Sequence, residues 1–523
     1  MSILDPIFNN NASGGMITLV RPPIIFSATA YSTPVTLPIG LAYIASLLRK
    51  HSYPVKIVDC IGMDIDRVTT SEDGRFKMQG ASFEKAINAI PPQSDIIGFS
   101  VMFSQEWPFI RSFIKAVRKA FPHAIFVVGG EHVTALPDYS LRDCPEINFA
   151  IAGEGELSFL ALCSAIRKKQ DLQAVPGICY IKDGSFFSNP KKRIVKVDEM
   201  PWPAWDLLEL GPYFQPNFTM GISHGRNLPI LATRGCPYQC TFCSNANMWT
   251  TKYVMRNPQD VVDEIEYNIK QYGANGIDFF DLTAIVQKNW VMEFTEELKK
   301  RKIKIPWSLP SGTRSEALDS EVLSNLKETG MELLVYAPEN GSARVLKDVK
   351  KRVNLPRMIS SIKMAKKYLL TVKLNLVIGF PNEKRIDVLK TALMMWYLAF
   401  QGVDDADLSL FSPYPGSELF RQLLSEKKIT AIDDSYFENL LVMYDFTFLK
   451  SYCKSISGLE LNIYRVIAMS IFYLISYVWF PTRILRLFPF VLPSRQFIPR
   501  SILEQRLYDI VARARLQKRL KST

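Results

Sequence analysis

The sequence predicts an α/β protein with a doubly wound N-terminal domain, then a partial (β/α)6 barrel, then a helical, apolar and basic C-terminal region. Short apolar runs alternate with helical patterns over residues 16–181, and the same alternation resumes after residue 226. A chain of 523 residues is also too long for one ordinary domain. We therefore expect domains at 1–190, 226–430 and 431–523, with a linker at 191–225.

The first domain is expected to contain a parallel sheet wrapped by helices. Its apolar runs are short, and the segments between them carry apolar positions at helical spacing. Such a sheet binds ligands at the carboxyl ends of its strands. The expected strands are 17–20, 55–59, 96–100, 125–129 and 149–152, and the expected helices are 40–50, 107–121 and 156–169.

The linker is charged and then proline-rich, with Pro201 and Pro203. Beyond it, six strand and helix units predict the partial barrel, whose functional residues should gather at the carboxyl ends of the strands. The expected strands are 228–233, 276–281, 307–309, 332–337, 372–378 and 406–411, with helices such as 258–272 and 316–329 between them.

Three of the eight cysteines, Cys236, Cys240 and Cys243, directly follow the expected strand 228–233. Soft thiolates select zinc or iron-sulfur clusters, and a structural zinc site normally has four protein ligands. A set of three therefore favours an iron-sulfur cluster with one open iron position. The alternatives are a zinc site completed by His224, or reduced thiols in a core.

The spacing CxxxCxxC after a strand resembles the radical S-adenosylmethionine (SAM) family, whose other motifs recur in order at the later strand ends. This resemblance implies a 4Fe-4S cluster on Cys236, Cys240 and Cys243, with SAM chelating the fourth iron. It also implies that Phe242 lies against the adenine, with plain packing of the loop as the alternative. The later motifs begin at Asp281, Glu339, Gly379 and Pro413.

Further SAM contacts are expected at the mouth of the barrel. Glu339 ends an apolar strand and needs a donor, which a hydroxyl or ammonium group of SAM can supply. Asp281 has the same interpretation, or it caps the helix that follows. Gly379 allows the backbone to approach the cofactor closely, and Pro381 fixes the turn.

The strand ends of the first domain, together with residues 38–42, resemble the Rossmann-like cobalamin-binding domain that precedes many radical SAM domains. No Asp-x-His-x-x-Gly motif occurs, so we expect no histidine ligand to cobalt. One alternative is a domain that keeps the fold without the ligand, and His132 could be a turn residue satisfied by backbone. The expected cobalamin contacts are Ser100, Ser104, Gly129, Gly130, His132, Gly153 and Glu154.

The resemblance implies reductive cleavage of SAM to methionine and a deoxyadenosyl radical, with electrons from a donor protein. Cobalamin further implies methylation of an unactivated carbon, although relatives form rings instead. The alternatives are a radical SAM cyclase or oxidoreductase, or a non-enzymatic zinc-binding scaffold. The motifs assign no catalytic residue and no particular substrate.

The C-terminal region carries much of the net charge of +12. Residues 481–523 contain ten Lys or Arg and two acids, and they follow the apolar segment 466–480. This order favours an anionic membrane surface over nucleic acid, and with it a hydrophobic or lipid substrate. Segments 466–482 and 484–492 are expected to form an interfacial or core hairpin, since a full span needs about twenty apolar residues.

The unpaired cysteines and the polar residues 1–15 favour a cytoplasmic protein, peripheral on the inner face of the membrane.

Overall fold

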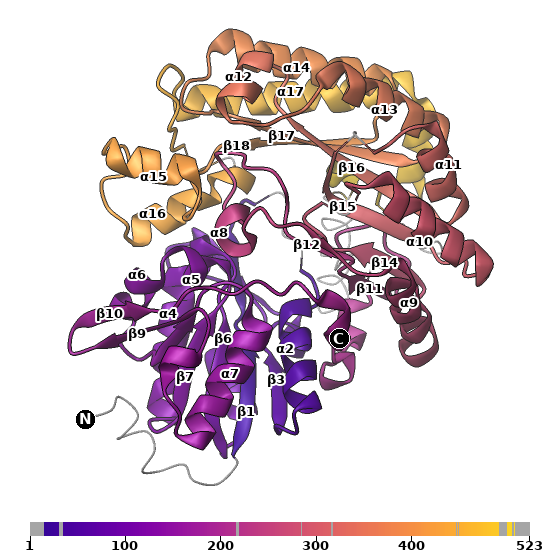
Figure 1. The fold of residues 1–523 in the computed structure, drawn as a ribbon. Helices are drawn as coiled ribbons and strands as arrows, with labels where there is room; N and C mark the ends of the chain where they lie inside the picture. The colour runs from indigo at the N-terminus through magenta and orange to yellow at the C-terminus, as the bar shows by residue number, and fades with distance from the viewer. Residues whose placement is uncertain are drawn as a thin grey trace, which may run out of the picture.

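Two sheets organise the computed structural model, which describes residues 15–30, 35–215, 219–283, 285–314, 317–445, 447, 449–490, 499–504 and 507. Each sheet belongs to one lobe, and the chain passes from the first lobe to the second through residues 191–226 (Figure 1). The cysteine segment and the short helix α8 (Asn245–Trp249) lie where the two lobes meet.

The first sheet has seven strands in the order β10-β9-β8-β7-β6-β1-β3. Five of them pair in parallel, as the apolar runs predicted, but β9 and β10 are antiparallel. The five expected strands are thus confirmed as the parallel part of the sheet, and β9 and β10 add an antiparallel edge that was not predicted. Asp183 and Gly184 both have positive φ and make a tight hairpin, which leaves no room for a crossover helix. The strands are β1 (Met16–Arg21), β3 (Val55–Asp59), β6 (Ser94–Ser100), β7 (Ile125–Gly129), β8 (Phe149–Ile151), β9 (Ile178–Lys182) and β10 (Ser185–Ser188).

Helices cover both faces of this sheet, as a doubly wound fold requires. Helices α2 (Ile39–Lys50) and α7 (Gly155–Lys168) pack on one face, and α3 (Phe83–Ala89) and α4 (Trp107–Ala120) on the other. A small antiparallel sheet of β2 (Ile24–Ser27), β5 (Phe76–Gln79) and β4 (Val68–Thr70) was not predicted.

The second sheet has six parallel strands in the order β11-β14-β15-β16-β17-β18, so neighbours along the chain are neighbours in space. The predicted strand 228–233 is divided, because β11 ends at Ile230 and β12 (Thr233–Arg234) turns away to pair with β13 (Val254–Met255). The other strands are β14 (Gly276–Phe279), β15 (Trp307–Thr313), β16 (Met331–Glu339), β17 (Thr371–Ile378) and β18 (Asp405–Leu410).

Helices follow the strands of the second sheet on its outer side (Figure 1). The expected helix 316–329 begins at Ser320, because the Asp319 carboxylate accepts from Val322 N at 3.0 Å; residues 315 and 316 lie outside the described residues. The helices are α9 (Pro258–Tyr272), α10 (Lys288–Lys300), α11 (Ser320–Glu328), α12 (Ala343–Asp348), α13 (Leu355–Lys367), α14 (Arg385–Phe400), α15 (Glu418–Ser425) and α16 (Asp434–Asn439).

The C-terminal apolar segment forms one long helix, α17 (Gly458–Trp479), followed by the 3-10 helix η8 (Pro481–Phe490). It begins before residue 466 because Ser457 caps it, accepting from Glu460 N at 3.2 Å. The length and composition of α17 would allow it to cross a membrane, but 39% of its most apolar 18-residue stretch is buried inside the molecule. Residues 491 and 492 of the expected hairpin, and most of the basic tail, lie outside the described residues.

Candidate functional site

The carboxyl ends of the two sheets face each other across the cysteine segment (Figure 1). Helix α8 rests on α5 (Glu131–Ala135) of the first lobe, where Asn247 Nδ2 donates to Thr134 O at 3.1 Å and the Ser244 hydroxyl donates to Glu131. Gly416, after β18, lies against both Asn247 and Ala135. Residues from both lobes therefore enclose the segment that carries the three cysteines.

Backbone contacts fix the cysteine loop. Gly235 has φ +87°, and a Cβ there would lie 2.5 Å from Lys252 O, so this turn requires glycine. Thr241 N donates to Val349 O at 3.0 Å, and Thr241 O accepts from Leu419 N at 2.8 Å. These contacts set where the three thiols emerge.

A zinc site and an iron-sulfur cluster place different demands on the three thiols. Among the described residues, no three His, Cys, Asp or Glu side chains lie close enough to hold one metal ion. His224, the zinc alternative's fourth ligand, instead lies 3.2 Å from the Glu332 carboxylate. In an iron-sulfur cluster, each thiolate binds a different iron, so no shared ion is needed.

Unpaired buried polar atoms beside the cysteines also fit a bound polar group. Within the described part of the chain, the Thr241 hydroxyl and both amide atoms of Asn245 are buried and have no hydrogen-bond partner. Burial raises the pKa of Cys240, while the nearby Lys351 ammonium opposes that rise. A positive charge beside this thiol favours the thiolate that metal binding needs.

Asp281 holds the start of the cysteine loop. Its carboxylate accepts from Ala232 N at 3.1 Å and from the Thr233 hydroxyl at 2.5 Å, and it also bonds Thr233 N. The alternative that Asp281 caps the following helix is wrong, because α10 starts only at Lys288. Burial raises the pKa of Asp281 to about 6. Its SAM contact stays a prediction.

Glu339 ends β16 and faces a donor that the sequence analysis did not identify. Lys351 Nζ lies 2.8 Å from its carboxylate, and both side chains are mostly buried. Burial opposes the charge of Lys351, but Glu339 and Cys240 together raise its pKa. Glu339 has φ +64°, an uncommon value for a residue with a side chain. The predicted SAM contact of Glu339 remains untested.

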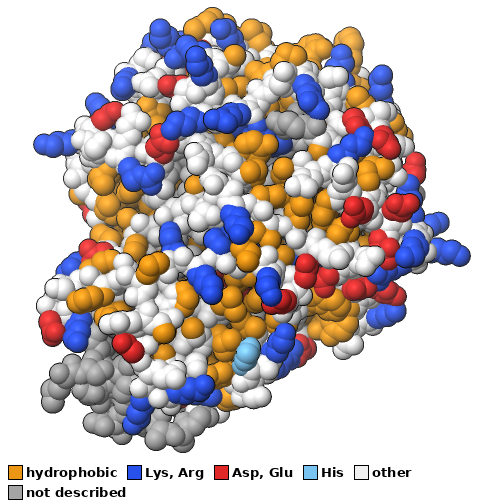
Figure 2. Space-filling view, viewed as in Figure 1, with side chains coloured by type: hydrophobic (Ala, Val, Ile, Leu, Met, Phe, Trp, Pro, Cys, Tyr) orange, Lys and Arg blue, Asp and Glu red, His pale blue; other side chains and the backbone are white. Residues whose placement is uncertain are grey.

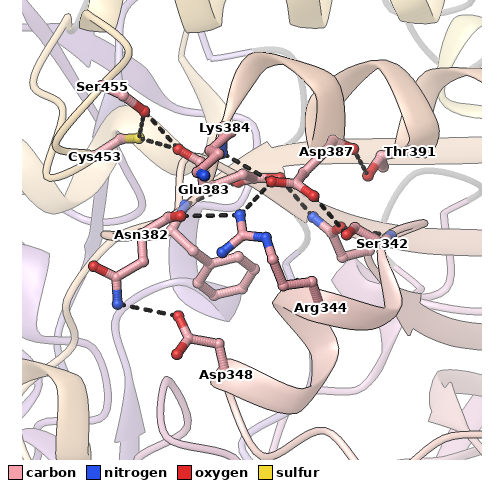
Figure 3. Close-up of polar contacts among 12 residues, drawn as sticks. Ser342, Arg344, Asp348, Asn382, Glu383, Lys384, Asp387, Thr391, Cys453 and Ser455 are labelled. Atoms are coloured by element: carbon pink, nitrogen blue, oxygen red, sulfur yellow. Dashed lines mark hydrogen bonds and ion pairs between the residues drawn. The ribbon is translucent and has the colours of Figure 1, made fainter.

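Glu383 organises the turn after β17 (Figure 3). Its carboxylate accepts from Gly379 N at 2.5 Å, Phe380 N at 3.0 Å and Asn340 Nδ2 at 2.7 Å, and burial raises its pKa to about 7. Gly379 has φ +90° and lies against Leu461, so a side chain there would be strained. Pro381 O accepts from Lys454 N at 2.9 Å.

Phe242 connects the cysteine loop to this turn. Its ring centroid lies 5.5 Å from that of Phe380, which in turn lies 5.3 Å from Phe411. The structure thus contains the loop packing that was the alternative for Phe242. The adenine contact stays a prediction.

His132 is a satisfied core histidine. Its ring stacks on Trp107 at 4.8 Å, Nδ1 lies 3.0 Å from the Ser104 hydroxyl and Nε2 lies 3.3 Å from the Ser140 hydroxyl. Burial lowers its pKa to about 3. Serine side chains, not backbone, satisfy this ring. His132 and Ser104 are both buried, and their cobalamin contacts stay predictions.

The remaining expected contacts gather at one edge of the first sheet, where Ser100 ends β6 and Gly129 ends β7. A Cβ on Gly130, at φ +124°, would lie 2.3 Å from Val101 O, so the fold itself requires this glycine. Gly153, at φ +90°, donates its N–H to the Thr134 hydroxyl at 2.9 Å. This edge faces the second lobe (Figure 1).

Glu154 links the two lobes, and its predicted cobalamin contact is untested. It is 3% exposed, and its carboxylate pairs with Arg193 Nε at 2.9 Å and Arg234 Nη1 at 3.0 Å. Glu156 lies 2.7 Å from Arg234 Nη2. Arg234 directly precedes Gly235, so these pairs tie the first lobe to the cysteine loop. The position of Arg234 beside the cysteine motif was the one signal in the sequence that could have identified Arg234.

The chain matches two known families. Residues 28–163 match the B12 binding domain, and residues 230–395 match the Radical SAM superfamily. These matches and the two sheets confirm the predicted order of a Rossmann-like cobalamin-binding domain and a radical SAM barrel.

Three relatives align with most of the chain. An uncharacterised methyltransferase of Pyrococcus horikoshii is 29% identical, over 80% of this chain and 86% of the relative. The cytidylyl-2-hydroxyethylphosphonate methyltransferase of Streptomyces wedmorensis is 27% identical, over 75% and 78%. The anaerobic magnesium-protoporphyrin IX monomethyl ester cyclase of Rubrivivax gelatinosus is 26% identical, over 74% and 66%.

A solved structure shares the fold. It is the radical SAM methyltransferase TsrM from Kitasatospora setae, with cobalamin and a 4Fe-4S cluster bound. The TM-score is 0.63 at 14% identity, and the match covers 88% of this chain and 89% of that one.

Proposed function

We propose that this chain, which belongs to the radical SAM superfamily and carries a B12 binding domain, methylates an unactivated carbon of its substrate. Cobalamin, SAM and a 4Fe-4S cluster are the cofactors of these two domains. The observation that carries the proposal is the cysteine loop, held between the carboxyl ends of both sheets by Asn247, Ser244 and Arg234.

Named residues would hold the cofactors. Cys236, Cys240 and Cys243 would bind three irons, and the unpaired atoms of Thr241 and Asn245 would meet polar groups of SAM. With these groups bound, the site would supply two things: a carbon radical that abstracts a hydrogen atom from the substrate, and a methyl group that takes the place of that hydrogen.

Residues of both lobes would exclude water and orient the groups. Phe242 and Phe380 form an apolar wall beside the loop, and Glu383 holds the backbone of the Gly379 turn. Gly129, Gly130, Gly153 and Ser100 would receive cobalamin at the sheet edge that faces this wall.

A radical SAM cyclase is the second candidate, since one of the aligned relatives is a cyclase. The mass of the product separates the two: methylation adds a carbon, whereas ring closure removes hydrogen.

A hydrophobic or lipid substrate and peripheral contact with the inner face of the membrane complete the proposal. The support is the apolar helix α17 and the basic sequence that follows it. A cytoplasmic enzyme could take such a substrate from the bilayer surface.

An electron donor protein would dock beside the cluster. A cavity of about 670 Å³ between α12 and α13 is lined by Lys347, Lys350, Lys351 and Arg352 among others. Val349, between these cations, accepts from Thr241 in the cysteine loop. Lys350 and Lys351 are paired with Glu418 and Glu339, so Lys347 and Arg352 supply the positive charge that an acidic donor would meet close to the cluster ligands.

The test is anaerobic reconstitution with iron, sulfide and hydroxocobalamin, followed by counting of iron, zinc and cobalt per chain. We expect iron and cobalt together, and cleavage of added SAM under reduction. Cys236→Ala should lose iron and SAM cleavage, whereas Cys163→Ala, in the core of the first lobe, should keep both. One zinc without iron would instead support the scaffold alternative.

A further inference from the structure

Helix α14 presents an apolar stripe to the outside of the molecule. Its opposite side is committed to the core through buried residues such as Met395 and Leu398. The exposed residues recur every three or four positions, the spacing of a single helix face. They are Ile386, Leu389, Leu393, Tyr397 and Phe400.

Helix α17 carries a second stripe of the same kind. Arg465, Ala468 and Phe472 face the core, whereas Leu474 and Val478 are 63% and 68% exposed. The exposed apolar residues of this helix are Leu459, Ile463, Val466, Ile467, Leu474, Val478 and Trp479.

The two helices run side by side in the same direction, so the stripes form one surface. Near the helix starts Arg385 pairs with Glu460, in the middle Trp396 Nε1 donates to Ala468 O at 3.0 Å, and at the ends the rings of Phe400 and Trp479 lie 5.3 Å apart. We call these exposed residues the α14/α17 face. It lies on the outer side of the second lobe, away from the first (Figure 1).

Exposed lysines lie on and beside the α14/α17 face. The acids within these helices are both paired, Glu460 with Arg385 and Asp387 with Arg344. Lys363 Nζ lies 3.4 Å from the Tyr397 hydroxyl, and Lys390 lies within α14. Figure 2 shows orange apolar side chains among blue Lys and Arg along this side of the molecule. An apolar face with aromatic residues and a cationic border suits an anionic lipid surface.

Buried contacts hold α17 on the protein. Arg465 is fully buried and donates to Val442 O at 3.1 Å, and the Tyr473 hydroxyl donates to Asp405 at 2.7 Å. Crossing a bilayer would break these contacts and place the Arg465 charge in hydrocarbon. The helix must therefore lie parallel to any membrane that it meets.

We propose that the α14/α17 face inserts into the headgroup layer of an anionic phospholipid membrane, with both helix axes in the membrane plane. This inference rests on the proposed peripheral contact and assigns it to two helices, of which α14 belongs to the barrel itself. The barrel would then stand on the membrane, and the cysteine loop would lie on the far side of its sheet.

The test is co-flotation of the full-length protein with vesicles of phosphatidylcholine alone or mixed with phosphatidylglycerol. The face variant is Leu389→Glu, Leu393→Glu and Leu474→Glu together. Its matched control is Val68→Glu, Phe187→Glu and Leu424→Glu, which changes three exposed apolar residues elsewhere on the molecule. All six side chains are exposed, so both variants should fold.

We expect the parent and the control to float with the mixed vesicles, and the face variant to lose roughly tenfold or more of its binding. Equal binding by all three proteins would overturn the inference. The inference would also be overturned if the parent and the control formed a dimer, the face variant did not, and none of the three bound vesicles. The occupant of the α14/α17 face would then be a second copy of the chain. Iron content and SAM cleavage, measured on the same samples, report on the proposed function separately.

Discussion

Gly235 shows how one residue can determine whether a cluster site forms. Its φ of +87° and the close approach of Lys252 O leave no space for a side chain just before Cys236. Gly235→Ala should displace the cysteine loop, and we expect most of the iron to be lost on reconstitution. Gly211→Ala is the matched control, because a Cβ at Gly211 meets nothing within 4 Å. Full iron in both variants would contradict the argument.

His132 should make the first lobe sensitive to acid. Its folded pKa of about 3 lies below the ordinary value of 6.5, since burial outweighs the opposing effect of Asp143. Between about pH 3 and pH 6.5, His132 therefore binds a proton in the unfolded chain but not in the folded one. The free energy of unfolding falls as the pH drops below 6.5. The loss should approach about 1.4 kcal/mol per pH unit.

Urea unfolding at neutral and mildly acidic pH checks this prediction. His132→Gln keeps a hydrogen-bonding side chain near Ser104 but does not titrate, so its stability should fall less between the two conditions. If parent and variant lose stability equally, other groups cause the acid sensitivity.

Single residues also show what the sequence could and could not predict. The three cysteines were identifiable because their ligand chemistry is local in the chain. Lys351 and Glu383 were missed as site residues, because each acquires its role from a partner that the topology supplies. The surroundings of His132 could not be predicted, because its position near Gly130 does not reveal that Trp107 and two serines enclose it.

At the scale of elements, the Glu154 pairs join β8 and its following loop to β12. Glu154→Gln would leave Arg193 and Arg234 buried with less compensation, a change that costs about 3–5 kcal/mol when a buried pair is broken. We expect lower thermal stability and faster loss of iron to a chelator. Glu199→Gln is the control, because its partner Lys196 is exposed and surface pairs contribute little. Equal iron loss would show that the pairs do not hold the loop.

Elements with a strong apolar period were predicted within a few residues, as for β3, β7 and α9. The antiparallel β9-β10 edge and the three-stranded sheet were not predicted, because the direction of a strand depends on the turn before it and on the strand it pairs with. Helix α14 was expected as part of the fifth strand and helix unit, but its bounds were not predicted. It is apolar on both sides, one facing the core and the other the solvent, so it lacks the contrast that marks an amphipathic helix.

At the scale of the whole molecule, the charge distribution separates two partner surfaces. The basic cavity between α12 and α13 adjoins the cysteine loop, whereas the α14/α17 face lies on the outer side of the barrel. Lys347→Glu with Arg352→Glu should slow reduction of the cluster by an acidic electron carrier such as a flavodoxin, by roughly tenfold or more at low salt. Reduction by dithionite, a small reagent that needs no docking, should be unchanged.

The control is Lys119→Glu with Lys168→Glu, which makes the same change in net charge on exposed residues of the first lobe. Added salt should slow reduction of the cluster in the parent and in this control, because screening weakens steering by charge. The difference in reduction rate between these two proteins and the cavity variant should therefore become smaller. If the control slows as much as the cavity variant, net charge governs donor encounter and the cavity is not the docking site. If dithionite reduction also slows, the substitutions have disturbed the cysteine loop through Val349 and Thr241.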